Sequence, residues 1–238
     1  MTQKIPTAKD IVDAYNLLVR NIDEEAQGTN SGRAYGGILR ATKGKLVESI
    51  AKTCIEIAWR NLGGRRGRLS FEKEPILVPL RKEYLKRVED PNIRAYILRH
   101  IKNYVYKFTT DIHVSIDDHL AIGVECKAYT ENAMLKRIAV DGMFLKHAHP
   151  SARNVLFQFE SQLGGDYSDL SKKARFGSYP THTILSYFPD VDLHIITLLE
   201  GERKVDRPIH KKGFFKELGR RSLGQAIKTL EGLLRERL

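Results

Sequence analysis

The sequence predicts an α/β protein, because stretches with helical periodicity alternate with short stretches that have the pattern of β-strands. Residues 43–62 carry apolar side chains at intervals of three and four, which places them on one side of a helix. Residues 111–127 alternate between apolar and polar side chains, as half-buried strands do. Strand-like segments at 154–159 and 192–199 follow a helical stretch at 131–146, so both kinds of element recur along the chain.

The first predicted element is a helix over residues 7–27. Thr7 is placed to cap this helix and Asp10 follows three residues later, an arrangement typical of a helix N-terminus. Residues 27–44 are rich in Gly, Ser, Asn and Thr, which predicts a surface loop before the helix at 43–62. Whether this loop faces phosphate or only solvent stays open. Three of its residues are candidates for DNA contacts: Arg33, Arg40 and Lys43.

The remaining elements are a broken helix, a further strand and a C-terminal helix. Residues 80–106 are expected to be mainly helical, with an interruption around Asp90 and Pro91 because proline disrupts a helix interior. Residues 181–188 have the composition of a strand. The last helix begins near Ser222, and its apolar side is expected to pack on the chain's own core, with a dimer interface as the alternative.

The charge of the chain predicts a polyanionic partner, with nucleic acid as the first candidate. The formal net charge is +11 and the isoelectric point is about 9.6. Surplus positive charge that only aids solubility is the alternative interpretation. The densest basic stretch covers residues 203–221, including Lys211 and Lys212, and we expect it to clamp a phosphate backbone.

The length of 238 residues predicts a single domain over 1–238, with its core at about 43–200 and a basic segment and helix at 203–238. The sequence contains neither an apolar run of roughly 20 residues nor the pattern of a signal peptide, so we expect a cytoplasmic protein without a membrane partner. Cys54 and Cys126 lack metal-ligand spacing and are expected to be reduced and buried.

Residues 111–127, with the sequence DIHVSIDDHLAIGVECK, predict a β-hairpin around a polar turn. If the apolar residues of both strands line the same face, the numbers of paired residues must add to an even value. A three-residue turn then pairs Ile116 with Leu120 and Ile112 with Val124.

This register places Asp111 opposite Glu125, with Cβ atoms about 5 Å apart. Two like charges in this position weaken a sheet unless a cation lies between them. Mg²⁺ prefers oxygen ligands, so both carboxylates, the backbone carbonyl of Cys126 and a substrate phosphate would form a suitable site. Lys127 follows on the same face and can orient or deprotonate an attacking water. A chance pairing of acid and lysine on a strand is the alternative, but the agreement of register, apolar pattern and basic charge favours catalysis.

The residues Asp111 and, after 13 intervening residues, Glu125-Cys126-Lys127 resemble the signature of the PD-(D/E)xK nuclease superfamily, with Thr110 in place of the leading proline. The resemblance covers about 111–146. It implies a mixed central β-sheet flanked by helices, as in the restriction-endonuclease-like core. It also implies Mg²⁺-dependent hydrolysis of DNA by in-line attack, leaving 5′-phosphate ends.

The same resemblance implies further site residues. In many of these enzymes an acidic residue on an upstream helix faces the metal, and Glu48 matches that position, with Glu56 as a weaker substitute and a solvated glutamate as the alternative. The helix after the motif is similar in placement to one that lies beside DNA. The candidates for DNA contacts on and before it are Tyr129, Asn132, Lys136 and Arg137, and Asp141 lies on the same helix.

The small size and the lack of an ATPase or helicase motif resemble a type II restriction endonuclease, which implies a homodimer acting on a short palindrome in double-stranded DNA. Two other functions remain open. One is a repair or junction-resolving nuclease with the same core. The other is a DNA-binding protein that has a degenerate nuclease fold without catalysis.

Overall fold

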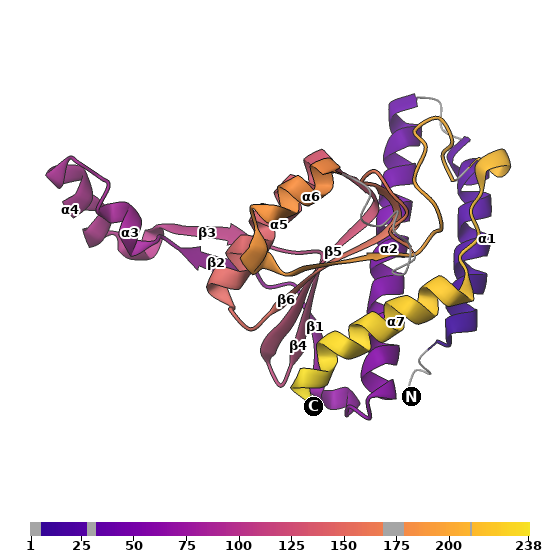
Figure 1. The fold of residues 1–238 in the computed structure, drawn as a ribbon, viewed down its shortest axis with the longest axis horizontal. Helices are drawn as coiled ribbons and strands as arrows, with labels where there is room; N and C mark the ends of the chain where they lie inside the picture. The colour runs from indigo at the N-terminus through magenta and orange to yellow at the C-terminus, as the bar shows by residue number, and fades with distance from the viewer. Residues whose placement is uncertain (1–5, 28–31, 169–178, 210) are drawn as a thin grey trace.

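A five-stranded mixed sheet in the order β1-β4-β5-β6-β7 lies at the centre of the computed structural model (Figure 1). The structure describes residues 6–27, 32–168, 179–209 and 211–238, and the side chains of residues 20–40 and of Lys212 lie outside the description. Strands β1, β4 and β5 pair antiparallel, whereas β5, β6 and β7 pair parallel. The strands are β1 (Leu69–Glu72), β4 (Ile112–Ile116), β5 (His119–Glu131), β6 (Arg153–Gln162) and β7 (Leu193–Thr197). The α/β class and the mixed sheet are therefore confirmed.

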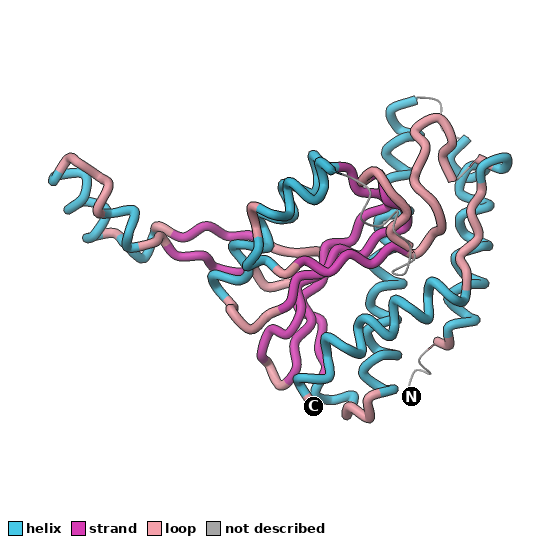
Figure 2. Tube along the Cα trace, viewed as in Figure 1, coloured by secondary structure: helices cyan, strands magenta, loops and turns pink. Residues whose placement is uncertain are grey.

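Helices cover both faces of this sheet, as Figure 2 shows. One face packs against three helices, α1 (Ala8–Gln27), α2 (Gly32–Asn61) and α7 (Arg220–Leu234), and the largest hydrophobic cluster lies between them and the strands. The other face packs against α5 (Asn132–Ala148), on which α6 (Tyr179–Ser186) lies. Because both faces are covered, every residue of β4 is buried. The last helix packs on the chain's own core, as its apolar stripe predicts.

A second, two-stranded sheet projects from this body as an arm, which we define as residues 76–108 (Figure 1). Its elements are β2 (Ile76–Pro79), α3 (Lys82–Leu85), α4 (Pro91–Arg99) and β3 (Val105–Phe108). Short 3₁₀ turns complete the fold at Arg66–Arg68, Ile101–Asn103, Pro189–Val191, Lys212–Phe214 and Arg235–Arg237. Asp90 caps α4 by accepting from the backbone N–H groups of Asn92 and Ile93, and Pro91 occupies the first helical turn. The expected mainly helical stretch at 80–106 is thus wrong in its extent, since it is broken into two helices, a 3₁₀ turn and the start of β3.

The predicted loop at 27–44 is wrong, because α2 already begins at Gly32. Glycine costs a helix roughly 1 kcal/mol per residue, a preference that tertiary context overrides. The later part of α2 is held in the core by Val47, Cys54 and Trp59. Extending an existing helix costs less than starting a new one, which favours its continuation through the glycine-containing segment.

The predicted strand at 181–188 is also wrong, because residues 179–186 form α6. Its buried and partly buried residues are Thr181, Ile184 and Leu185, which follow helical and not strand spacing. The Thr181 hydroxyl donates to the Leu163 carbonyl and lies 2.7 Å from Oδ1 of Asn132 at the start of α5. Packing against α5 therefore decides the conformation of this segment.

The hairpin β4–β5 forms, but its turn differs from the prediction. Asp117 and Asp118 both have positive φ, 50° and 63°, and make a two-residue turn that pairs Ile116 with His119 instead of Leu120. A bulge then leaves Ala121 without a partner, and beyond it Ile112 pairs with Val124 as predicted. The bulge restores the register that buries the apolar residues of both strands on one face.

Cys54 and Cys126 are buried free thiols, as expected. None of the helices in the described ranges combines the length and apolar character that crossing a bilayer requires.

Candidate active site

The side chains of Asp111 and Glu125 converge on the amine of Lys127. Lys127 Nζ lies 2.8 Å from Asp111 Oδ2 and 2.7 Å from Glu125 Oε2. Glu125 and Lys127 are two residues apart on β5 and so share one face of the strand, while Asp111 directly precedes β4. The predicted register thus brings the three side chains together on the sheet face that packs against α5.

The position of Asp111 is fixed by the backbone of the neighbouring strand. Asp111 Oδ2 accepts a hydrogen bond of 2.7 Å from the Cys126 N–H, so the carboxylate takes the place of a ladder partner where β4 has not yet begun. In an antiparallel ladder the N–H and C=O of one residue point toward the same neighbour. The Cys126 carbonyl therefore also faces the edge at which Asp111 lies.

Burial and charge shift the pKa values in this cluster. Burial raises the pKa of Glu125, and the neighbouring Lys127 only partly offsets that effect. Burial would lower the pKa of Lys127, but the two carboxylates outweigh it and hold the pKa above its ordinary value. Burial also raises the pKa of Asp141 on α5, whose charge acts on Glu125. Lys127 is therefore an ammonium at neutral pH in this arrangement.

Glu48 lies on α2, which packs on the sheet face opposite to the one that carries Glu125 and Lys127. Its carboxylate is 2.8 Å from Lys52 Nζ and 3.0 Å from Lys73 Nζ. Burial would raise the pKa of Glu48, but the hydrogen bonds from Lys52 and Lys73 hold it below its ordinary value. The charge of Glu48 acts on the Cys126 thiol, which places it within electrostatic reach of β5. Glu56 lies two turns further along α2, about 12 Å along the helix axis from Glu48.

The oxygen atoms around Lys127 are chemically suited to a hard divalent cation. Asp111 and Glu125 already hold one positive group between them, and the Cys126 carbonyl faces the same place. In the parts of the chain that the structure describes, no three His, Cys, Asp or Glu side chains are grouped to hold a metal ion. Mg²⁺ is commonly bound by one or two carboxylates, with water and substrate oxygens as the other ligands.

The predicted DNA-contact residues near the end of β5 form a charged cluster. The guanidinium of Arg203 stacks 3.7 Å from the ring centre of Tyr129. Lys43 on α2 is partly buried, which lowers its pKa, while the charge of Glu160 on β6 opposes that shift. Glu160 is itself buried and pairs with Lys216 at 2.9 Å. These contacts tie the basic C-terminal segment to the sheet.

The other candidates for DNA contacts fall into four groups. Lys136 and Arg137 are exposed on α5, so both are accessible to a ligand. Asn132 holds Thr181 of α6 through its side-chain oxygen, which is a structural role. Lys211 is partly exposed and already interacts with another group of the protein. The side chains of the remaining three, Arg33, Arg40 and Lys212, lie outside the described residues.

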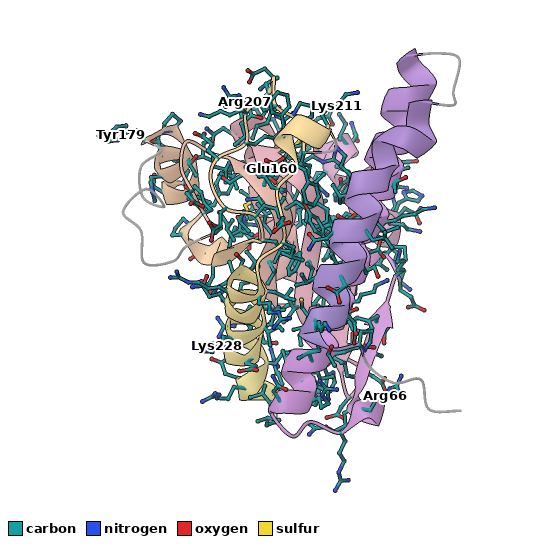
Figure 3. The ribbon with its side chains drawn as sticks, turned by 90° about the vertical axis from the view of Figure 1, so that its right-hand side faces the viewer. Arg66, Glu160, Tyr179, Arg207, Lys211 and Lys228 are labelled. Atoms are coloured by element: carbon teal, nitrogen blue, oxygen red, sulfur yellow. The ribbon has the colours of Figure 1, made fainter. Side chains whose placement is uncertain are left out.

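Basic side chains lie toward both ends of the molecule. Figure 3 shows Arg207 and Lys211 toward one end, and Arg66 and Lys228 toward the opposite end. The two lysines that pair with Glu48 were not predicted from the sequence. Lys52 follows Glu48 by four residues on the same helix and could have been found by that spacing. Lys73 comes from the loop after β1, and no local pattern indicates its contact with α2.

No protein-family model matches the chain. A curated relative, the type II restriction enzyme DdeI of Desulfomicrobium norvegicum, is 46% identical over 231 residues, which cover 96% of this chain and 96% of the relative. The mixed sheet flanked by helices is consistent with a restriction-endonuclease-like fold. The match includes almost the whole chain and is not confined to the hairpin motif. This chain therefore belongs to the family of type II restriction enzymes that includes DdeI.

Proposed function

We propose that this restriction endonuclease is a Mg²⁺-dependent enzyme that cleaves both strands of a short DNA sequence and leaves 5′-phosphate ends. The convergence of Asp111 and Glu125 on Lys127, within 2.8 Å, is the observation that carries this proposal. We assign the ion to Asp111, Glu125 and the Cys126 carbonyl, with Glu48 binding or positioning it or its water. When bound, Mg²⁺ supplies charge stabilisation to the phosphate under attack.

The chain's own residues then position the reactants. Lys127, which stays an ammonium while both carboxylates contact it, orients the attacking water and faces the phosphate. Deprotonating that water would require Lys127 to leave these contacts first. The water attacks phosphorus in line with the 3′-oxygen and loses a proton to the solvent, the P–O3′ bond breaks, and the 3′-oxygen takes up a proton from the solvent. The products are a 5′-phosphate and a 3′-hydroxyl.

We further propose that the enzyme acts as a homodimer on double-stranded DNA. Two copies related by a two-fold axis present two identical sites to the two strands of a palindrome. The exposed Lys136 and Arg137, together with the basic segment around Lys211, are the proposed DNA contacts. A cytoplasmic location stays a prediction of the sequence.

A plasmid digestion tests the proposal directly. We expect discrete bands with Mg²⁺ and no cleavage with EDTA, and fragment ends that ligate without prior phosphorylation. Lys127→Ala should abolish cleavage while DNA binding persists. Lys228→Ala, which changes an exposed lysine on α7, serves as the matched control and should cleave like the wild type. Cleavage retained in Lys127→Ala would refute the assigned role. Activity confined to branched or damaged DNA would instead favour a repair enzyme.

A further inference from the structure

The arm exposes apolar side chains that its own fold leaves uncovered. At its base, Ile76, Val78 and Phe108 are buried against Leu145 of α5 and its surroundings. Beyond this base, the only buried residues of α3 and α4 are Leu85 and Ile97. Six large apolar side chains of the arm are more than half exposed: Leu77, Tyr84, Ile93, Tyr96, Leu98 and Tyr106. A two-stranded ribbon is marginally stable by itself, so covering this surface would stabilise the arm.

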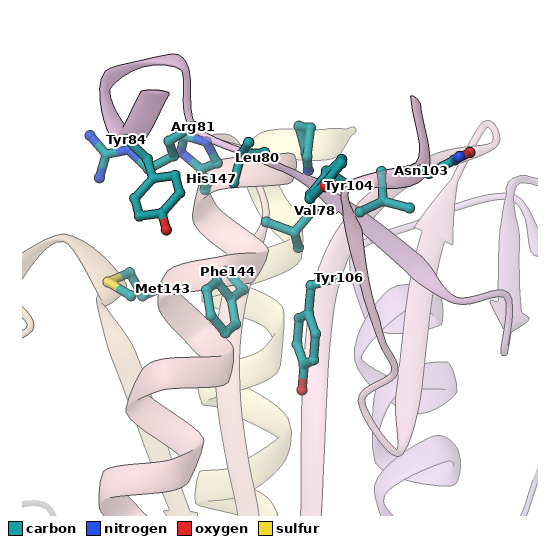
Figure 4. Close-up of a pocket in the computed structure, with 12 residues that line it drawn as sticks. Val78, Leu80, Arg81, Tyr84, Asn103, Tyr104, Tyr106, Met143, Phe144 and His147 are labelled. Carbon is teal, nitrogen blue, oxygen red and sulfur yellow. The ribbon is translucent and has the colours of Figure 1, made fainter. Parts of the chain in front are cut away.

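An apolar groove of about 580 Å³ lies where the arm meets the body (Figure 4). We call it the base groove and define it by Val78, Tyr84, Tyr106, Met143 and Phe144. The rings of Tyr106 and Phe144 lie 5.2 Å apart and form part of its wall. Apolar and aromatic side chains make up most of the lining, which also includes Arg81, Asn103 and His147, and this mainly apolar surface suits an apolar side chain.

The tip of the arm offers a matching surface. Helix α4 carries Ile93 and Tyr96 three residues apart, and both are about half exposed. Residues at this spacing are neighbours on one side of a helix and are the usual anchors when a helix binds in a groove. One copy of the chain therefore contains both a groove and an apolar helix, at opposite ends of the same arm.

The exposed area is of the size that a stable dimer needs. A half-exposed large side chain presents on the order of 100 Å², so the six side chains on the arm present roughly 600 Å². Met143, which is also exposed, and the groove walls add to this area. A standard protein interface buries about 800 Å² per partner.

We propose that two copies of this chain associate through their arms, side by side and antiparallel, so that α4 of each copy occupies the base groove of the other. The contact is isologous, because groove and helix are exchanged by the same two-fold axis. This inference rests on the homodimer of the proposed function and names its surface. DNA is the competing occupant, because the exposed Tyr84, Tyr96 and Tyr106 can stack on bases, whereas Ile93, Leu98 and Met143 cannot pair with phosphates.

The salt dependence of association distinguishes a second copy of the chain from DNA as the occupant. The arm carries eight Lys and Arg residues against three Asp and Glu residues, so two arms repel each other. Added salt screens that repulsion and should tighten an apolar contact between them, whereas it would weaken a contact with DNA. We expect the dimer dissociation constant of the full chain, without DNA, to fall between 50 and 500 mM NaCl in sedimentation experiments. A rise would overturn the proposal.

The variant Ile93→Asp tests the surface itself. Ile93 is 54% exposed, so the variant should keep its circular dichroism spectrum and melting temperature, while the dissociation constant should rise about 30-fold or more. Leu17→Asp is the matched control, because Leu17 is a 63% exposed leucine on α1, and it should stay dimeric. A dimer that persists in Ile93→Asp would overturn the arm contact and leave the nuclease proposal intact. If Ile93→Asp loses DNA binding while the sedimenting species keeps its dimeric mass, the arm contact is also overturned.

Disulfide trapping tests the antiparallel arrangement. The pair Ile93→Cys and Met143→Cys in one chain should form a covalent dimer under mild oxidation, since the native Cys54 and Cys126 are both buried. Ile93→Cys alone should stay monomeric on a non-reducing gel. A covalent dimer from this single variant would indicate contact between the two tips and overturn the arrangement. The absence of a covalent dimer from the double variant would overturn it as well.

Discussion

Replacing Lys127 with methionine is expected to destabilise the enzyme as well as to inactivate it. The change removes the only positive group that contacts both Asp111 and Glu125 among the described residues, while it keeps a side chain of similar length. Two carboxylates then face each other with no cation between them, and the partly buried Glu125 loses its charged partner.

The expected loss follows from the two contacts. A hydrogen bond that involves a charged group contributes about 1.5–3 kcal/mol, and the amine of Lys127 makes two of them, at 2.7 and 2.8 Å. The contact with Glu125 is the more protected one, because that side chain is 15% exposed. The contact with Asp111 is discounted, since 39% of that side chain is exposed and solvent screens it. The sum is a loss of about 2–4 kcal/mol in the free energy of unfolding.

Urea unfolding in EDTA and in Mg²⁺ measures this loss. In EDTA the Lys127→Met variant should show the full loss, whereas Lys228→Met should stay within about 0.5 kcal/mol of the wild type. Mg²⁺ should stabilise Lys127→Met more than the wild type, because no ammonium competes for the carboxylates, yet cleavage should not return. A variant as stable as the wild type in EDTA would refute the inference that this lysine holds the two carboxylates together.

Two further predictions concern the framework. Gly142→Ala in α5 should lower the free energy of unfolding by about 1–2 kcal/mol in urea titrations, because the new Cβ would lie 2.6 Å from Val191 Cγ1. This loss outweighs the usual preference of a helix for alanine over glycine. A variant more stable than the wild type would show that the contact relaxes freely. Burial would raise the pKa of Asp192, but the charges of His194 and Arg153 hold it below its ordinary value. This stabilisation is present above the unfolded pKa and is lost as the pH falls through the folded one, so Asp192→Asn should cost less than about 1 kcal/mol at pH 6 and progressively less as the pH falls through the folded pKa. If thermal unfolding shows that the stability lost in Asp192→Asn grows as the pH falls toward 3, the predicted direction of the pH dependence is wrong.

The parity of the hairpin register could be predicted because it does not depend on the turn. Any pairing that buries Ile112 and Val124 on one face also places Asp111 and Glu125 together on the opposite face. The turn itself was mispredicted, since Asp117 and Asp118 adopt left-handed conformations and the strand then inserts a bulge at Ala121. The burial of the apolar face determines the register, and the turn adapts to it.

Local patterns failed where packing outweighs intrinsic preference. The glycine-containing start of α2 and the threonine-containing α6 both have poor helical composition, yet each is helical in the structure. Preferences of this kind amount to about 1 kcal/mol or less per residue, which is comparable with the burial of a single methylene group. Contacts with distant parts of the chain can therefore reverse them.

The sequence alone determined which side chains meet at the candidate site, because side chains two apart on a strand share a face and an even register aligns the two strands of one hairpin. Only the tertiary structure decided that Lys73 contacts Glu48, that the basic segment is tied to Glu160, and that residues 76–108 leave the body as an apolar arm. These features bring together residues that are far apart in the sequence and are not related by the repeat of a helix or a strand. They depend on which surfaces remain to be covered once the sheet has formed.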